Sequence, residues 1–570
     1  MQPLQNIKDD IKRIFYRLFN VKKEEVMFDF TLDYPKNNEF GDMYTNIAMV
    51  GAKFAKQKPL EIASAIKQEL EMLDYISSVN IAGAGFINIK INKSFWQNAI
   101  KEVINYIALP SNTFGFNKKG NNEIINLEYV SANPTGPIHL GHTRGSVYGD
   151  VIYRLLTKNG YKVTKEYYIN DAGVQVGKLT KSVFIRYLQA QGKNMELEEG
   201  CYPGEYLIDV AKDLLQNHGT DLDIDEDFEI IRSFSINYLM NNIKKSLLKL
   251  GIDHDVYTSE FEVIKQGYVD KVMQKLESQD LIYKGFTEKP KGQASKDWKE
   301  EEQVLFKSKQ FGDDEDRVMI SASGAKTYFV SDVAYQLHKI ERGFKNLILV
   351  IGADHLGYVK RIKSATKALN NSVDLKVQLC QLVKFLKNGE PVKMSKRKGT
   401  FETLDDVLDE VPADIIRFIM ISRKNDVSMD FDLEKVKEQS KDNEIFYIQY
   451  AYSRASSVLN LVKDFDNTKI DSSLFNSLLD LDYIKKVLEF PKVISIALNN
   501  LEPHHIVFYL YELAGCFHKL WHSGNEDKSL RFVIENDIIK TNTRLCLAFL
   551  YRYIVDASFN IFGIKPIESM

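Results

Sequence analysis

The stretch NLEYVSANPTGPIHLGHTRGSVYGD, residues 126–150, decides the fold class of this 570-residue chain. Apolar residues over 124–130 predict a buried strand. A loop with two prolines and a glycine follows over 131–138, and a helix is expected over 139–158. Residues 161–169 predict a second strand. A strand, a helix and a strand in this order indicate a β–α–β unit that opens a nucleotide-binding sheet.

The pattern of the rest of the chain predicts three domains, as its length allows. Residues 1–110 are expected to form a small N-terminal α+β domain. Residues 120–440 are expected to form an α/β Rossmann-type catalytic domain with a parallel sheet, and the charged stretch at about 179–321 reads as a helical insertion. Residues 441–570 show only helical periodicity, which predicts an all-α C-terminal bundle.

Composition limits the class of protein. No window approaches the roughly 18 apolar residues of a membrane span, and residues 4–18 read as an amphipathic helix and not as a signal peptide. We therefore expect no membrane. Four scattered cysteines form no CxxC pair, so we expect no zinc and a cytoplasmic location. The net charge of −3 gives no global sign of nucleic acid, so any RNA site must be a local basic face.

Two histidines lie three residues apart at the expected start of the helix. His139 and His142 would share one face beside the positive end of the helix dipole, where phosphate binds favourably. Imidazoles can donate hydrogen bonds to a pentavalent phosphorus. Gly141 leaves bare backbone where an adenine ring could lie. The alternatives are a capping or packing role, or a metal pair, for which no third ligand is evident.

A second cluster, Lys393-Met394-Ser395-Lys396-Arg397-Lys398-Gly399, has four cations within six positions. Its lysines could close over a departing pyrophosphate and neutralise the charge that develops in the transition state. The alternative is a solvated basic turn or a contact with an RNA backbone. Together with the histidines, the cluster favours a grip on the triphosphate of ATP by Lys393, Met394 and Lys396.

A third motif, Gly352-Ala353-Asp354-His355, follows the strand expected over 346–351. Open α/β sheets bind ligands at such strand ends, and a carboxylate there can accept both ribose hydroxyls. Capping of the next helix by Asp354 is the alternative. We expect Gly352 and Asp354 at the ATP site.

Residues 126–150 resemble the bacterial type of arginyl-tRNA synthetase, a class I aminoacyl-tRNA synthetase. The segment contains the family's HIGH-type signature: Ala132, Asn133, Pro134, Thr135, Gly136, Pro137, Ile138, His139, Leu140, Gly141 and His142. Further segments match in order: Phe40-Gly41-Asp42, residues 168–173, Gln449-Tyr450-Ala451, and Leu510–Ala514 with Phe517-His518. The resemblance covers essentially the whole chain. It implies that the chain activates L-arginine with ATP to arginyl-adenylate and transfers it to the 3′ end of tRNA-Arg.

The resemblance also assigns residues to arginine. Six match positions that bind it in the family: Glu128, Ser131 and Asn133 at its α-amino and carboxylate ends, Tyr328 and Asp332 at its guanidinium, and His355. The chemistry fits, because a planar guanidinium prefers a carboxylate partner and an aromatic ring can pack its stem. His355 stands where some members carry glutamine, so a role at ATP is also open.

The implied reaction is in-line attack of the arginine carboxylate on the α-phosphorus of ATP, accompanied by Mg²⁺. His139 and His142 would bind phosphate, and Lys393 and Lys396 would stabilise the transition state. The resemblance further implies a monomer, an N-terminal domain that binds the outer corner of the tRNA, and a bundle that reads the anticodon.

Aromatic residues of the bundle with basic neighbours could stack on splayed anticodon bases. The candidates are Tyr450, Tyr452 and Arg454, and Tyr551, Arg552 and Tyr553. Packing within the bundle is the alternative for each tyrosine.

Four other functions compete with this interpretation. A non-catalytic RNA-binding relative would be free to lose the histidines and lysines, which are intact here. A cysteinyl-type enzyme would need a zinc site, and a glutamyl-type enzyme has no use for Asp332 as a partner of a cation. A small adenylyltransferase would not need the bundle.

Overall fold

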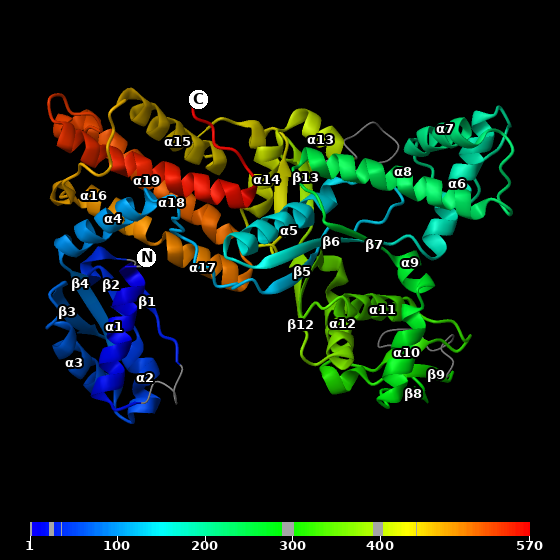
Figure 1. Ribbon diagram of the computed structural model, residues 1–570, viewed down its shortest axis with the longest axis horizontal. Helices are drawn as coiled ribbons and strands as arrows, with labels where there is room; N and C mark the ends of the chain where they lie inside the picture. Colours follow the sequence, from blue (N-terminus) through cyan, green and yellow to red (C-terminus); the bar gives the residue numbers. More distant parts are fainter. Residues whose placement is uncertain (1–2, 22–27, 36, 288–300, 392–402, 441) are drawn as a thin grey trace.

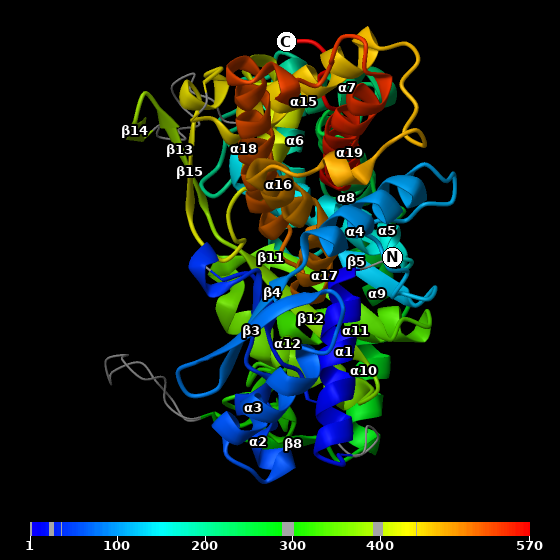
Figure 2. The same ribbon diagram turned by 90° about the vertical axis from the view of Figure 1, so that its left-hand side faces the viewer.

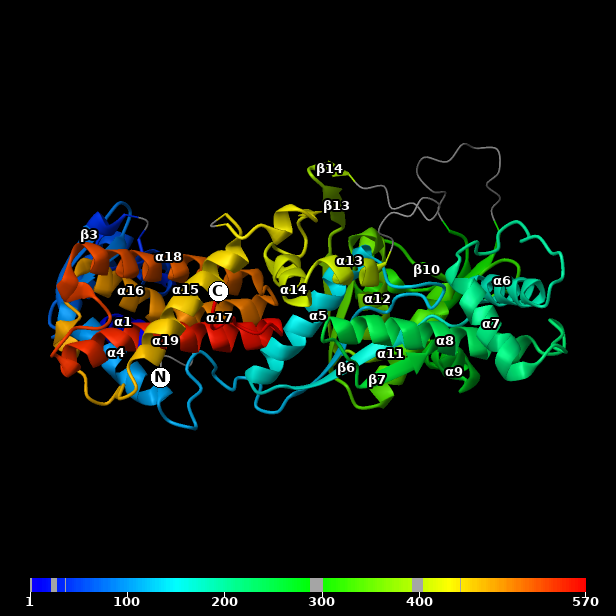
Figure 3. The same cartoon turned by 90° about the horizontal axis from the view of Figure 1, so that it is seen from above.

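The computed structural model describes residues 3–21, 28–35, 37–287, 301–391, 403–440 and 442–570. The molecule is elongated (Figure 1). The N-terminal unit and the C-terminal bundle occupy one end, a parallel sheet lies in the middle, and helices α6 to α8 extend to the other end, as the view from above also shows (Figure 3).

The central sheet has the strand order β12-β11-β5-β6-β7, and all its strands are parallel. They are β5 (Ile124–Glu128), β6 (Lys162–Ile169), β7 (Val256–Ser259), β11 (Asn346–Gly352) and β12 (Asp374–Cys380). Helix α5 (Leu140–Lys158) joins β5 to β6, so the predicted β–α–β unit is confirmed. The chain proceeds outward from β5 in one direction and from β11 in the other. The carboxyl ends of β5 and β11 therefore form the switch point where open α/β sheets bind ligands.

Close packing of α5 on the end of β5 depends on one glycine. A Cβ atom on Gly149 would lie 2.3 Å from the ring of Tyr129, so a larger side chain would push the helix off the sheet. This contact holds the middle of α5 against the residue that follows β5.

The expected helical insertion is not one unit. Helices α6 (Val174–Ala190), α7 (Tyr206–His218) and α8 (Phe228–Lys249) lie between β6 and β7, but β7 returns to the central sheet. The part after β7 contains α9 (Glu260–Lys265), α10 (Tyr268–Ser278), α11 (Tyr328–Glu341) and an antiparallel sheet of β8 (Ile282–Gly285), β9 (Gln303–Phe306) and β10 (Arg317–Ile320). The stretch over 179–321 is largely helical, as expected, but it also contains the strands β7 to β10, which were not predicted because four-residue strands are too short to show a clear period.

The N-terminal unit is the expected α+β structure. Its antiparallel sheet has the order β1-β2-β4-β3, from β1 (Leu32–Asp33), β2 (Met43–Thr45), β3 (Ile76–Ala82) and β4 (Phe86–Ile91). The helices are α1 (Pro3–Leu18), α2 (Ile47–Ala55), α3 (Pro59–Leu70) and α4 (Lys93–Ile107). Helix α1 buries the stripe Ile7, Ile11, Ile14 and Phe15, as its amphipathic sequence predicts.

After the central sheet come α12 (Leu356–Leu369), β13 (Val383–Lys387), β14 (Glu390–Pro391), α13 (Leu404–Glu410), α14 (Ala413–Ile421) and β15 (Met429–Asp432). The predicted bundle follows as α15 (Glu444–Leu461), α16 (Leu478–Leu488), α17 (Phe490–Asn500), α18 (His504–Glu526) and α19 (Ile538–Phe562). Among the described residues, α19 is the one helix long and apolar enough to cross a membrane. Two thirds of its apolar window (67%) is buried, so it is a core helix of the bundle, as expected.

Direct contacts join the units. Lys485 of the bundle pairs with Asp42, and Lys492 pairs with Asp33, so the N-terminal unit packs beneath the bundle (Figure 2). On the catalytic side, the buried Arg417 donates to Asp150 of α5, to the carbonyl of Leu250 after α8, and to the carbonyl of Phe562 in α19. One guanidinium thus connects three parts of the molecule.

Candidate active site

A cavity of about 1850 Å³ opens at the carboxyl ends of β5 and β11. Its wall brings together most of the residues predicted for ATP and arginine: Ser131, Asn133, His139, Gly141, His142, Tyr328, Asp332, Gly352, Asp354 and His355. Glu128 is not on this wall. Lys393, Met394 and Lys396 lie outside the described residues, although the segment that follows them contributes Thr403 and Asp406 to the cavity.

The two histidines form the first turn of α5. His139 is the N-cap, and its Nδ1 accepts a hydrogen bond from the N–H of Gly141 at 3.1 Å. Nδ1 of His142 accepts from the N–H of His139 at 3.4 Å, and the two rings lie 3.9 Å apart. A neutral ring that accepts at Nδ1 carries its proton at Nε2. Both rings are therefore set to donate from Nε2, which suits a phosphate oxygen.

Burial decides the charge of His142. Loss of solvent, and then the neighbouring His139, lower its pKa to about 4. The ring is neutral at physiological pH and remains a hydrogen-bond donor without a fixed positive charge. It can thus donate a hydrogen bond to a phosphate throughout a reaction without holding the product by an ion pair.

The third motif forms a turn at the end of β11. Asp354 lies in the short 3₁₀ turn Ala353–His355, and the N-cap of α12 is His355, so Asp354 does not cap α12. Its carboxylate is two-thirds exposed (66%), and Oδ2 lies 3.4 Å from Nε2 of His355. A Cβ on Gly352 would lie 2.3 Å from Oδ1 of Asp354, so glycine is required for the carboxylate to fold back over the strand end.

Carboxylates concentrate at the other side of the cavity. Asp332 of α11 has its pKa raised to about 7 by burial, then by the charges of Glu260 and Glu128, while a hydrogen bond from Tyr358 works in the opposite direction. Burial, with a contribution from Asp171, also raises the pKa of Glu260. Two carboxyl groups with raised pKa values in one pocket favour a cationic ligand, which would stabilise their ionised forms.

Glu260 was missed by the sequence interpretation. It is the first residue of the short helix α9, directly after β7. Had β7 been predicted, the rule that ligand residues follow parallel strands would have indicated Glu260.

Tyr328 is one of the exposed residues among those predicted to bind arginine. It begins α11 at the rim of the cavity and is 69% exposed. Its ring faces Gly173, where a Cβ would be 3.4 Å away.

The loop after β5 has an unusual backbone. Val130 and Ser131 have φ angles of 72° and 41°, a left-handed conformation that side chains rarely adopt. The hydroxyl of Ser131 donates to Glu128 at 3.1 Å and accepts from the N–H of Tyr168 at 3.1 Å. Next to it, the amide of Asn133 contacts Gln175 and Asn170. This part of the wall is thus held in a strained shape by side-chain hydrogen bonds.

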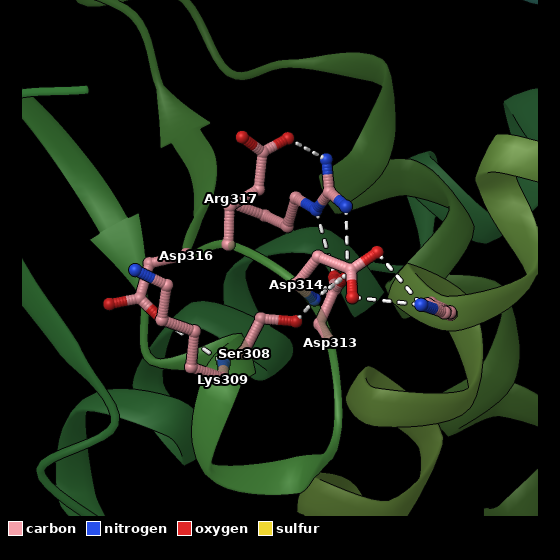
Figure 4. A network of polar contacts seen from close by, with 8 residues as sticks. Ser308, Lys309, Asp313, Asp314, Asp316 and Arg317 are labelled. Carbon is pink, nitrogen blue, oxygen red and sulfur yellow. Dashed lines mark hydrogen bonds and ion pairs between the residues drawn. The ribbon is translucent and has the colours of Figure 1, made fainter. Parts of the chain in front are cut away.

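A polar network holds α12 from outside the cavity (Figure 4). Asp313 accepts from Ser308 and from two nitrogens of Arg317, which lower its pKa against the effect of burial. The adjacent Asp314 receives Lys360 of α12 at 2.8 and 2.9 Å. The loop therefore fixes the helix that follows the Asp354 turn.

The bundle presents one exposed aromatic and basic surface on α15 and α18. Tyr450 and Tyr511 are nearly half exposed, and Arg454 donates to the hydroxyl of Tyr450 with its guanidinium 4.2 Å from the ring. Tyr452 and Tyr551, which were also candidates for stacking, are fully buried, bonded to Asp556 and to a backbone carbonyl. They pack the bundle, so the prediction was wrong for them.

The described residues include one group with metal-ligand geometry: Glu502, His504 and His505, whose ligand atoms lie within 4.8 Å of one another. The group lies at the start of α18, away from the cavity. Lys424 already pairs with Glu502, and the helix N-terminus is positive, so the local field disfavours a cation. The expectation of no zinc stays a prediction.

Three family models match the chain in order. Residues 4–91 match the model described as "Arginyl tRNA synthetase N terminal domain", residues 105–456 match "tRNA synthetases class I (R), catalytic domain", and residues 448–570 match "DALR anticodon binding domain". The second match alone covers more than half of the chain.

Relatives of high similarity span the full length. The arginine–tRNA ligase of Wolbachia pipientis wMel is 45% identical over 98% of each chain, and that of Rickettsia prowazekii is 43% identical over 100% of each. Among solved structures, the arginyl-tRNA synthetase of Thermus thermophilus superimposes with a TM-score of 0.72 over 100% of each chain at 16% identity, which shows the same fold.

Proposed function

Because the chain belongs to the arginyl-tRNA synthetase family and is an arginine–tRNA ligase, we propose that the cavity at the ends of β5 and β11 is its active site. The enzyme uses ATP, arginine and tRNA as substrates. The observation that supports the site is that groups suited to an anion and groups suited to a cation line the same cavity. Two histidines at a helix N-terminus, of which His142 is kept neutral by burial, line one side, and carboxyl groups with raised pKa values line the other.

Arginine lies with its guanidinium against Asp332 and Glu260, and with its α-amino and carboxylate groups toward Ser131 and Asn133. The guanidinium stabilises both ionised carboxylates, and each ionised carboxylate can accept two of its N–H groups. Tyr328 at the rim packs along the aliphatic stem. Glu128 takes part through Ser131, to which it is hydrogen-bonded.

ATP lies along the first turn of α5, with its phosphates toward Nε2 of His139 and His142 and its ribose toward Asp354. The arginine carboxylate attacks the α-phosphorus in line, and pyrophosphate leaves. The N-terminus of α5 and the two imidazole N–H groups stabilise the charge on the phosphorus oxygens. Lys393 and Lys396 neutralise the departing pyrophosphate, and Met394 contacts ATP with them.

The proposal extends to the metal ion, the tRNA and the oligomeric state of the enzyme. Mg²⁺ would accompany ATP, bound to its phosphate oxygens, and would neutralise part of their charge. The N-terminal unit binds the outer corner of tRNA-Arg, and the surface around Tyr450 binds its anticodon bases. The enzyme acts as a monomer in the cytoplasm.

The substitution Asp332→Asn tests the arginine site. The amide cannot pair with the guanidinium as an anion, and loss of a buried, charge-assisted contact is worth about 2–3 kcal/mol or more. We expect the KM for arginine to rise by about 30–150-fold, with the KM for ATP nearly unchanged, in arginine-dependent ATP–pyrophosphate exchange with tRNA-Arg present.

Lysine and glutamate are the control substrates in the same assay. An unchanged KM for arginine in Asp332→Asn would remove Asp332 from the site. Exchange supported equally by lysine would contradict the guanidinium assignment as a whole.

A further inference from the structure

One face of α11 carries more than the two residues proposed to meet the guanidinium. Tyr328, Asp332, Tyr335 and Lys339 follow one another at intervals of four, three and four residues, so they form a single stripe. Tyr328 and Asp332 line the cavity, whereas Tyr335 and Lys339 are buried behind its wall. The stripe therefore runs from the cavity wall into the core.

The buried end of the stripe reaches the opposite side of the amino-acid site. The ammonium group of Lys339, which is 1% exposed, pairs with the buried carboxylate of Glu128. Glu128 in turn accepts the hydroxyl of Ser131, whose strained backbone forms the cavity wall. A continuous chain of contacts thus runs from Lys339 to the loop proposed to hold the α-amino and carboxylate groups.

Tyr335 fixes the position of Lys339. The ammonium lies 4.1 Å from the centre of the Tyr335 ring, which stacks on Tyr168 at 4.0 Å. The hydroxyl of Tyr335 donates to Glu166 at 3.0 Å, and Glu166 also accepts from Arg342, Thr258 and Asn126. The pKa of Glu166 falls to about 2 despite its burial, because Lys339 and these hydrogen bonds stabilise its charge. The end of the stripe is therefore rigid.

We propose that Lys339 is a specificity-determining positioning residue that sets the distance between the two ends of the amino-acid site. Asp332 and Lys339 are seven residues apart on one helix, two turns or about 10.5 Å. Asp332 defines the guanidinium end, and Lys339, through Glu128, defines where Ser131 stands. Helix α11 thus selects the length of the substrate side chain as well as its charge. The inference rests on the proposed placement of arginine between Asp332 and Ser131.

The test compares arginine with two analogues that keep the guanidinium: homoarginine, one methylene longer, and 2-amino-4-guanidinobutanoate, one methylene shorter. The variants are Lys339→Gln, which keeps an N–H donor for Glu128, and Lys339→Met, which keeps only the length. The matched control is Lys271→Met, because Lys271 pairs with Glu341 at the exposed end of the same helix. The readout is kcat/KM in ATP–pyrophosphate exchange with tRNA-Arg present, beside the KM for ATP and the thermal midpoint.

One methylene in a fitted pocket is worth roughly 10–200-fold. We expect the preference for arginine over the analogues to fall by about tenfold in Lys339→Gln and further in Lys339→Met, with the KM for ATP nearly unchanged and Lys271→Met like the parent. If Lys339→Met does not fold, Lys339→Gln decides the outcome.

A Lys339→Gln enzyme that loses activity equally with all three amino acids would overturn the proposal, because a merely structural role predicts that result. Asp332→Asn is measured in parallel. If its arginine KM is unchanged, the placement of arginine itself is wrong. If that KM rises while the preference in Lys339→Gln stays that of the parent, only the role of Lys339 is wrong.

Discussion

Asp332 is partly buried, close to other carboxylates and on the wall of the cavity, so in the proposed site its protonation controls the binding of a cation. Its pKa of about 7 means that about half of the free enzyme carries a neutral carboxyl group at that pH. In the proposed placement, arginine requires the ionised form of Asp332. The cause of the shift, burial together with Glu260 and Glu128, disappears in part when a guanidinium enters, so binding and proton release are linked.

We expect the dissociation constant of arginine to rise by about tenfold between pH 8 and pH 6, because the ionised fraction of Asp332 falls by that factor. Isothermal titration of arginine across this range measures it. The contribution of His142 to ATP binding stays constant over this range, because its pKa of about 4 keeps the ring neutral. Arginine affinity that is flat from pH 8 to pH 6 would contradict the prediction.

The raised pKa of Asp332 makes stability change with pH in the direction opposite to that of a salt-bridged carboxylate. A raised pKa means that the folded free enzyme binds a proton more tightly than the unfolded chain does. Stability contributed by this group is therefore present at low pH and is lost as pH rises from about 4 toward 7. Bound arginine removes this penalty.

Much of the site could be predicted at the residue scale, for an identifiable reason. His139, Gly141 and Asp354 are short-range signals, each tied to a strand end and the start of a helix that a single sequence reveals. Glu260 and Lys339 lack such a signal, because their role depends on segments far away in the chain. Tyr328, Asp332, Tyr335 and Lys339 are spaced as a helical stripe, but the sequence alone does not show that Tyr335 and Lys339 are buried behind the cavity wall.

At the scale of elements, α5 is held by a buried ion pair. Asp150 accepts Arg417 in the core and also Arg154, whose side chain is 31% exposed. The two arginines offer a matched comparison on one carboxylate. Removal of a buried partner leaves a charge without compensation, whereas removal of a partly exposed partner lets water replace it.

We expect Arg417→Met to lower the free energy of unfolding by about 3–5 kcal/mol, and Arg154→Met to lower it by about 1 kcal/mol or less. Urea unfolding followed by circular dichroism gives both values under the same conditions. Equal losses in the two variants would mean that Asp150 is solvated and that the pair is not a buried anchor.

The elements that were predicted correctly share one property. The strand–loop–helix unit around α5, helix α1 and the bundle helices are long or strongly periodic, so local pattern determines them. Strand β7 has four residues and pairs only with β6, which is distant in sequence. The place of β7 in the sheet depends on tertiary contacts. When β7 is not recognised, the segment between β6 and β11 reads as one insertion.

At the scale of the whole molecule, the enzyme has to bind a tRNA, although its net charge is −3. Recognition must therefore be local. The surface around Tyr450, Arg454 and Tyr511 combines exposed rings with a guanidinium, the combination that binds unpaired bases.

We expect Tyr450→Ala to weaken the binding of tRNA-Arg by about 5–150-fold, the worth of one stacked base, with the KM values for arginine and ATP close to those of the parent. Fluorescence anisotropy at fixed salt measures the dissociation constant. Tyr283→Ala is the control, because Tyr283 is also exposed but lies on β8, remote from the bundle. A similar loss in both variants would contradict a specific stacking role.

The bond from Arg417 to the carbonyl of Phe562 has a consequence for the order in which the protein is made. Phe562 is synthesised 145 residues after Arg417, an interval of about 7–30 s at ribosomal rates of about 5–20 residues per second. Throughout that time the guanidinium lacks one of its three acceptors, and α5 lacks its contact with α19. The nascent catalytic unit can collapse early. Helix α5, however, reaches its final position only when the bundle has folded against it.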